Sequence, residues 1–494
     1  MTTNEEAVGA LNRSTPARKL ARAIEGVAYG LGVALFGWLI ARIVRNNLRW
    51  FDDGWDFLAY HLPFGIKIFE PDLIRLSPHL EELYLGSPLV FSWVIGLVWK
   101  LHPLLPLNAL HMLGLAAWLA ALPIVALLVG RQLVVFALLS LAAPLVLIHM
   151  MSGYVDLPAN VFILLLLISL FALQTGAARP LAWAGLGIVA LGIMGASKYT
   201  VMPLALVGSL TFAIVIHRRL QHFNRVRWLL IVLGLVAAST WGLRNLWLHG
   251  NPVYPLKPPV IGHLVPYTWT LPDSAVNWPA ELLGWPQPVV TLASIFELSA
   301  PERVGRMPRY KVDQSGTGLG STGFRMGGFG WPVVSVGIAG LAWGLWRRLL
   351  RPRELVPFLV LATTTLLLPQ SHELRYSLYI PLMFGFFVAV VARRAVSGWE
   401  RVVVLTACLA VSSWSVVNNS VYLEKRTRPL DQLARKEGID LNILPMATLY
   451  CGRGLGPNLV FLTGPTLREF RTNSSGPGRP CPGNGHEVIG TLSW

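Results

Sequence analysis

Long apolar runs separated by short basic clusters dominate the sequence. The first run spans 27–44, and the others lie near 86–101, 109–129, 132–150, 158–176, 181–197, 200–217, 228–246, 331–347, 354–368, 377–392 and 402–418. Most of these runs are long enough for an α-helix to cross a bilayer, which takes roughly 20 residues. The pattern therefore predicts an all-α polytopic membrane protein.

The basic clusters indicate the membrane side of each turn, because short loops rich in Lys and Arg stay in the cytoplasm. The strongest interior cluster runs from His217 to Arg227. Counting back from it alternates the sides of the earlier turns: Lys198 outside, Arg179 inside, Asp156 outside and Arg131 inside. The run 86–101 then has outer segments on both sides, so we interpret it as a re-entrant or interfacial helix. About eleven full spans remain, with the N-terminus inside and the C-terminus outside.

Three regions follow from this count. Residues 1–26 form a cytoplasmic N-terminal segment, whose basic stretch precedes a retained anchor and not a cleaved signal. Residues 27–420 form the transmembrane domain, with a first outer loop at 46–86 and a second large outer loop at 248–330. Residues 421–494 form a small soluble extracytoplasmic appendage. We expect the glycine-dense end of the second loop to fold over a membrane-surface cavity, with these possible anion contacts: Arg306, Arg309, Lys311 and Arg325.

Composition excludes a soluble protein. Hydrophobic residues make up 54% of the chain and charged residues 13%, and the mean hydropathy is +0.54. The formal charge of +16 reflects cytoplasmic turns and contact with anionic lipid, not nucleic-acid binding. Three cysteines are too few for a disulfide framework, but Cys451 and Cys481 lie in the predicted outer region and are expected to pair.

The acidic cluster after the first apolar run is the main candidate site. It contains Asp52, Asp53 and Asp56, followed by Tyr60 and His61. Carboxylates beside a bilayer are costly unless they meet water, a cation or a partner, so such a cluster marks a functional-site candidate. The alternative is that these residues only mark the water boundary of the first span.

Asp156 is expected on the same membrane face, at the outer end of another apolar run. It either orients an acceptor or joins the first-loop acids around a divalent cation; alternatively, it only complements a helix dipole. The candidate metal ligands are Asp53, Asp56, His61 and Asp156. For His61, a purely structural role is favoured over metal binding.

Four basic residues are candidates for binding a phosphate on this face. Lys198 lies in a connection too short to be a solvated loop, and Arg375 approaches from another apolar run. Arg244 and Lys67 are weaker members of the group. Snorkelling of these side chains to the membrane interface is the alternative.

Several short motifs follow one another along the chain, and the topology count places them on the same, outer side of the membrane. They are Asp-x-x-x-Tyr-His-Leu-Pro at Asp56–Pro63, Gly153–Pro158, Gly195–Tyr199, Gly250–Pro255 and Arg375–Tyr376. Over about residues 26–420 the chain resembles the GT-C superfamily of integral-membrane glycosyltransferases, in the group of protein mannosyltransferases and the aminoarabinose transferase of lipid A. The C-terminal region lies outside this resemblance.

The resemblance implies a GT-C-like fold and transfer of a sugar from a polyprenyl-phosphate donor to a glycan, lipid or protein acceptor. A first-loop acid acts as general base: Asp56 is favoured over Asp53, and Asp52 stays open as well, while Asp156 assists. The donor phosphate is bound by Lys198, Arg375, Arg244 and Lys67, and the substrate cavity is lined by Tyr60, His61, Tyr199, Tyr254 and Tyr376. The expected location is the inner membrane of a bacterial cell envelope, with the active site outside.

Two other classes of protein would also have many membrane spans and buried charges. A lipid or glycan transporter, or flippase, is expected to show repeats and charges at the bilayer midplane. A non-catalytic scaffold would have no use for the first-loop acids. The sequence itself names neither the sugar nor the acceptor.

Overall fold

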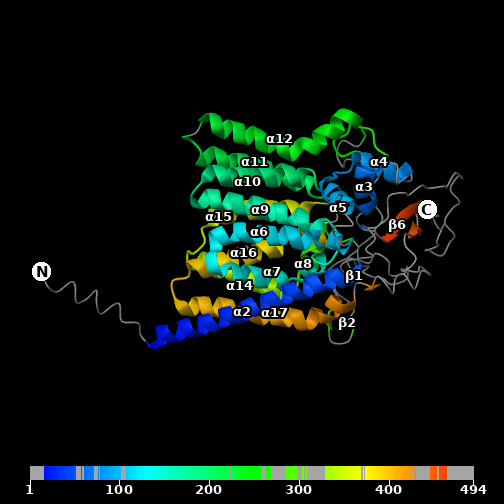
Figure 1. Cartoon of the computed structure of the whole chain (residues 1–494). Helices are drawn as coiled ribbons and strands as arrows, with labels where there is room; N and C mark the ends of the chain where they lie inside the picture. The colour runs from blue at the N-terminus through cyan, green and yellow to red at the C-terminus, as the bar shows by residue number, and fades with distance from the viewer. Residues whose placement is uncertain are drawn as a thin grey trace.

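The computed structural model describes residues 16–51, 57, 61–71, 76, 78–101, 107–222, 224–257, 263–268, 284–296, 303–304, 307–308, 329–368, 371, 373–425, 428–429, 446–452 and 456–463. Long helices lie side by side in one bundle, and shorter elements gather at one of its ends (Figure 1). The bundle helices are α2 (Pro16–Arg49), α6 (Leu113–Val129), α7 (Leu133–Ala142), α8 (Pro144–His149), α9 (Asp156–Thr175), α10 (Pro180–Gly195), α11 (Met202–Arg219), α12 (Asn224–His249), α14 (Trp331–Trp346), α15 (Pro352–Leu367), α16 (Tyr379–Arg394) and α17 (Gly398–Lys425).

The shorter helices are α3 (Leu62–Phe69), α4 (Pro78–Gly86), α5 (Val90–Lys100) and α13 (Gln287–Ile295), with 3-10 turns η2 (Leu107–Met112), η3 (Gly130–Gln132) and η6 (Leu374–Ser377). Three antiparallel strand pairs complete the described elements: β1 (Trp50–Phe51) with β4 (Arg428–Pro429), β2 (Arg303–Val304) with β3 (Met307–Pro308), and β5 (Met446–Gly452) with β6 (Gly456–Thr463). The β1–β4 pair joins the start of the first outer loop to the C-terminal region. The predicted domain boundaries at 26 and 420 fall inside the continuous helices α2 and α17.

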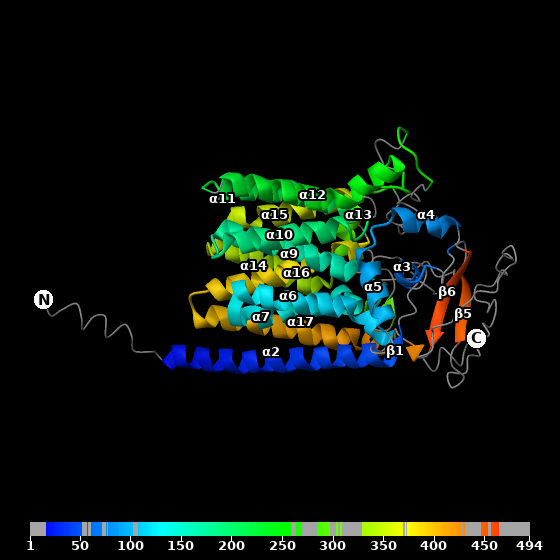
Figure 2. The same cartoon turned by 45° about the horizontal axis from the view of Figure 1, so that its top comes forward.

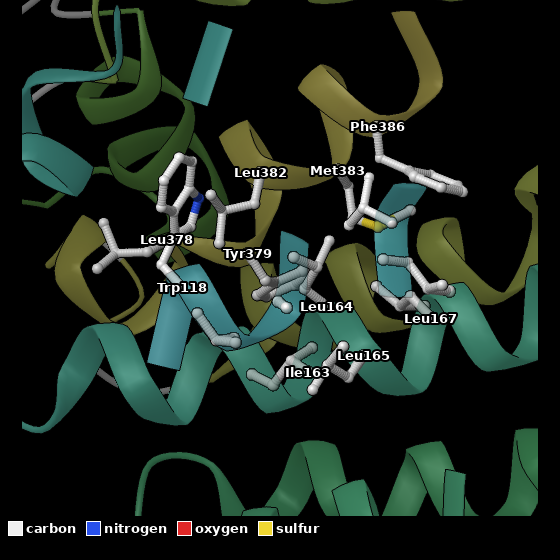
Figure 3. Packing of buried hydrophobic residues seen from close by; sticks show 14 of the residues in the cluster. Trp118, Ile163, Leu164, Leu165, Leu167, Leu378, Tyr379, Leu382, Met383 and Phe386 are labelled. Carbon is white, nitrogen blue, oxygen red and sulfur yellow. The ribbon is translucent and has the colours of Figure 1, made fainter. Parts of the chain in front are cut away.

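Two helices occupy the centre of the bundle. The apolar windows of α9 and α16 are each 94% buried, whereas that of α12 is only 17% buried. Leucines of α9 face Tyr379, Met383 and Phe386 of α16, with Trp118 of α6 beside them (Figure 3). A helix that is apolar on all sides is stable only when other helices or lipid surround it. The sequence of α9 therefore explains its central place.

The membrane class predicted from the sequence is confirmed by helix length and apolarity. Among the described residues, six helices are long and apolar enough to cross a membrane, and a bent pair raises this to seven if it counts as one span. They are Pro16–Leu48, Ala109–Ala142, Asp156–Thr175, Asn224–His249, Leu374–Arg394 and Gly398–Val417. The larger number of about eleven spans remains a prediction.

The stretch Ala109–Ala142 folds back on itself at η3. Gly130 has a φ of 58°, in the left-handed region that favours glycine. At the start of α6, a Cβ on Gly114 would lie 2.5 Å from the carbonyl oxygen of His149, the last residue of α8. Since the start of α6 meets the end of α8, α6 and α7–α8 form a hairpin. This hairpin corresponds to the two separate apolar runs at 109–129 and 132–150.

The helix α5 does not run through the bundle from end to end. It has 11 residues, and its axis is bent by 107° from that of α4. The backbone N–H of Val90 donates to the Ala196 carbonyl at 3.1 Å, at the end of α10. Beyond its other end the chain reaches η2 and then Gly114, which packs on His149. Both ends of α5 thus lie at the same end of the bundle, which supports the interpretation of 86–101 as a re-entrant or interfacial segment.

The opposite end of the bundle carries basic turns. Several of their arginines pair with glutamates, as follows: Arg131 and Arg401 with Glu25, Arg394 with Glu354, and Arg347 with Glu400. The N-terminal part of α2 lies at this end, while its C-terminal residue adjoins β1 beside α3–α5 (Figure 2). The two ends of the bundle therefore differ in charge and in the elements that cover them.

Cysteine labelling tests the path of α5. In a background with Cys451 and Cys481 replaced by serine, Leu101→Cys and Trp247→Cys are expected to react with an impermeant thiol reagent in intact cells. Trp346→Cys, at the basic end, is expected to react only after permeabilisation. All three side chains are on the protein surface, with exposed fractions of 41%, 88% and 78%. If Leu101→Cys instead reacts only after permeabilisation, as expected for Trp346→Cys, α4–α5 is a true span.

Candidate functional site

A buried ion pair marks the beginning of α9. The Lys198 Nζ lies 2.8 Å from the Asp156 Oδ1, and Asp156 is 1% exposed. Lys198 comes from the short connection between α10 and α11. Losing one partner of a buried pair leaves an uncompensated charge, which is strongly destabilising. Each residue therefore requires the other.

Asp156 keeps one oxygen without a hydrogen-bond partner in the described part of the chain. Its Oδ2 is buried and has no hydrogen bond among the described residues. The Lys198 ammonium has three N–H donors, of which one reaches Asp156. The pair thus retains both an acceptor and donors for a bound group.

A second charged pair adjoins the first. Arg375 in η6 lies 3.2 Å from Glu373, and its guanidinium donates to the Tyr376 hydroxyl at 3.0 Å. The ring of Tyr376 has the Lys198 ammonium 4.7 Å and the Arg375 guanidinium 4.9 Å from its centroid. An aromatic face attracts cations, and here one ring contacts both. The side chain of Tyr376 therefore joins the two ion pairs into one cluster, which we call the charged cluster: Asp156, Lys198, Glu373, Arg375 and Tyr376.

Asn160 fixes the geometry between α9 and η6. One turn after Asp156, its Nδ2 donates to the carbonyls of Asp156 at 2.8 Å and Arg375 at 3.3 Å. Its Oδ1 accepts from the backbone N–H of Tyr379 at 3.0 Å, at the start of α16. The side chain is 1% exposed. A single amide thus satisfies backbone groups at a helix end and places Arg375 beside Asp156.

The segment predicted to be the first outer loop contacts the same region through Phe57. A Cβ on Gly153 would lie 2.3 Å from the Phe57 ring. The ring of His111 makes an edge contact with the same Phe57 ring, with 5.3 Å between the two centroids. Only glycine permits this approach, three residues before Asp156. His61, which precedes α3, is also buried. The predicted residues Asp52, Asp53, Asp56 and Tyr60 lie outside the described residues.

Other predicted site residues belong to a separate junction around Gly86. The Gly86 carbonyl accepts hydrogen bonds from Trp241 and Asn245, both at 2.7 Å. Tyr199 donates its hydroxyl to the carbonyl of Tyr254, and burial raises the pKa of the Tyr199 hydroxyl above its ordinary value. These contacts tie the α4–α5 bend to α12 and the second outer loop.

Arg244 and Lys67 are likewise engaged elsewhere. Arg244 donates to the Leu85 carbonyl at 2.9 Å and stacks on the Trp241 ring at 4.7 Å. Lys67 forms an ion pair with Glu81, and its ammonium lies 5.4 Å from the Tyr84 ring centroid. Both residues therefore hold α4 in place and are not part of the charged cluster.

The structure thus divides the predicted residues. It brings together Asp156, Lys198, Arg375 and Tyr376, and it places Tyr199, Tyr254, Arg244 and Lys67 in the contacts around α4. Sequence reasoning missed Asn160 and Glu373. The available signals were the spacing of one helical turn from Asp156 to Asn160 and the proximity of Glu373 to Arg375 in the chain.

Several predictions concern residues outside the described part. Within that part, no three His, Cys, Asp or Glu side chains are grouped to hold a metal. Asp53 and Asp56 lie outside it, so the divalent-cation site stays a prediction. The anion contacts at Arg306, Arg309, Lys311 and Arg325 and the partner Cys481 also lie outside the described residues, whereas Cys451 lies in β5.

Comparisons of the chain with protein-family models, curated proteins and solved structures find no significant match.

Replacing the bridging amide tests its importance. Asn160→Leu keeps the approximate size of the side chain but removes three hydrogen bonds and leaves buried backbone groups unpaired. The free energy of unfolding should therefore fall by on the order of 2–4 kcal/mol. The exposed residue Asn224 provides the control: its side chain accepts a hydrogen bond from Arg227, so Asn224→Leu should lower stability by no more than about 1 kcal/mol. Thermal unfolding in one detergent compares them, and equal melting of the two variants would show that the bridge contributes little.

Proposed function

We propose that the protein transfers a sugar from a polyprenyl-phosphate donor to an acceptor at the extracytoplasmic membrane face. The observation that carries the proposal is the charged cluster at the beginning of α9. It lies near Gly153, against which Phe57 packs, so the loop that we propose as catalytic contacts the segment leading to the proposed phosphate site.

Lys198 is the primary donor to the leaving phosphate in this proposal. Departure of a lipid phosphate develops negative charge, which preorganised cations stabilise. The contact with Asp156 orients the Lys198 ammonium, and the Tyr376 ring, whose centroid is 4.7 Å away, restricts its position from another side. Arg375 adds a guanidinium held by Glu373 and Tyr376. Both cations are fixed before the donor arrives.

Asp156 is better suited to positioning than to proton transfer. Its carboxylate is the counter-ion that holds Lys198. The role of general base falls to a first-loop acid, with Asp56 proposed first and Asp53 second. Asp56 precedes Phe57 in the chain, and Phe57 is the residue that contacts the segment leading into α9. A base must reach the acceptor hydroxyl, and acceptor binding beside this segment meets that requirement.

The position of the charges favours a transferase over a lipid or glycan transporter. Asp156 is the first residue of α9, Lys198 lies between α10 and α11, and Arg375 precedes α16. Each is at the end of a helix, whereas transporter sites typically lie near the bilayer midplane. If the lipid-linked sugar crossed the membrane of reconstituted vesicles and was not consumed, the result would support the transporter instead.

Substitution of Lys198 tests phosphate binding. Lys198→Ala removes a charge-assisted contact, so donor affinity and turnover are both expected to fall, by about 10- to 100-fold. Lys67→Ala is the control because Lys67 pairs with Glu81 away from the cluster. Since Asp156 loses its partner in Lys198→Ala, the double variant Asp156→Asn with Lys198→Gln removes both charges and is expected to preserve the fold. Donor binding unchanged in that double variant would contradict the assignment.

Asparagine substitutions distinguish the two first-loop acids. Asp56→Asn preserves shape but abolishes proton acceptance, so single-turnover transfer should fall at least about a hundredfold while donor binding is retained. Asp53→Asn is measured beside it under the same detergent condition. Activity lost only in Asp53→Asn would assign the base to Asp53. Full activity in both would remove the first outer loop from the catalytic centre.

A further inference from the structure

The turn between α11 and α12 is basic and has no nearby acid in the chain. Its cationic and titratable residues are His217, Arg218, Arg219, His222, Arg225 and Arg227. From Leu157 to Pro272 the sequence contains neither Asp nor Glu. At the other basic turns, by contrast, Glu25, Glu354 and Glu400 each pair with arginine. Within the described part of the chain, no carboxylate therefore pairs with the arginines of the α11–α12 turn.

The contacts of these arginines are to neutral groups. Arg219 donates to the carbonyl of Gln174, and Arg227 donates to the Asn224 side chain at 2.7 Å. No salt bridge involves Arg218, Arg219, Arg225 or Arg227 within the described part of the chain. Except for the half-buried Arg227, these arginines are exposed. Four positive charges thus remain uncompensated in one turn.

An aromatic side chain joins this turn to an apolar surface. The Arg227 guanidinium lies 5.4 Å and the His217 ring 5.8 Å from the centroid of the Trp228 ring, which is 51% exposed. Tryptophan is enriched where the headgroups of a bilayer meet its hydrocarbon core. The next exposed residues along α12 are all aliphatic: Leu229, Val232, Leu233 and Val236. Polar and apolar binding surfaces are therefore adjacent.

We propose that the α11–α12 turn binds the headgroup of an anionic phospholipid, whose acyl chains lie along the exposed face of α12. Figures 1 and 2 both show α12 at the edge of the bundle, where lipid has access to it. The phosphate complements the unpaired arginines, and the chains cover the aliphatic residues beyond Trp228. This site lies at the basic end, opposite the charged cluster, and it does not depend on the proposed transferase activity.

Native mass spectrometry of the full chain in neutral detergent tests the site. The protein is titrated with phosphatidylglycerol and, separately, with phosphatidylcholine of the same chains, and bound lipids are counted. We expect preferential retention of phosphatidylglycerol. Each arginine near an anionic surface contributes about a fivefold change in affinity, so Arg225→Gln with Arg227→Gln should weaken phosphatidylglycerol binding about 25-fold. Phosphatidylcholine binding should stay unchanged.

A matched double variant controls for net charge. Arg131→Gln with Arg347→Gln also removes two positive charges, but these arginines pair with Glu25 and Glu400. It should retain phosphatidylglycerol within about twofold of the wild type. Melting temperatures of both variants in the same detergent verify that each is folded. Equal losses in the two variants, or equal retention of the two lipids by the wild type, would overturn the proposal. Displacement by millimolar inorganic phosphate would also overturn it, in favour of a soluble anion site.

Discussion

The need to pair every buried charge governs the organisation of this bundle. Asp156 is the first residue of α9, a helix whose apolar window is 94% buried. A carboxylate in such surroundings is tolerated only with a cation at contact distance, which Lys198 supplies at 2.8 Å. This requirement fixes the α10–α11 connection against the beginning of α9. Once Lys198 is there, Tyr376 and Arg375 complete the cluster around it.

Backbone satisfaction imposes a second requirement at the same place. Where α16 begins, backbone N–H groups lack helical partners, and lipid offers none. Asn160 answers this need by bonding to the carbonyls of Asp156 and Arg375 and to the N–H of Tyr379. Electrostatics and hydrogen bonding therefore act on the same few residues. A rigid arrangement of charges results, and the proposed sugar transfer would use such an arrangement to stabilise a departing anion.

The two ends of the bundle use charge in different ways. At the end with the charged cluster, oppositely charged side chains are buried and close together. At the other end, arginines are mostly exposed, and only some pair with Glu25, Glu354 or Glu400. The exposed turn between α11 and α12 has no such glutamate. The buried, paired charges suit the binding site that we propose, and the exposed arginines suit contact with lipid headgroups.

Local pattern alone determined the membrane class, the apolar segments and the exceptional character of 86–101. Hydropathy and loop charge are properties of neighbouring residues, so they are readable without a fold. Asp156, Lys198 and Arg375 were also recognisable as costly charges beside apolar runs. Their mutual contacts were not, because they depend on how α9, the α10–α11 connection and η6 pack in space. The same tertiary packing separated Arg244 and Lys67 from Lys198, since Leu85, Trp241 and Glu81 offer them nearer partners.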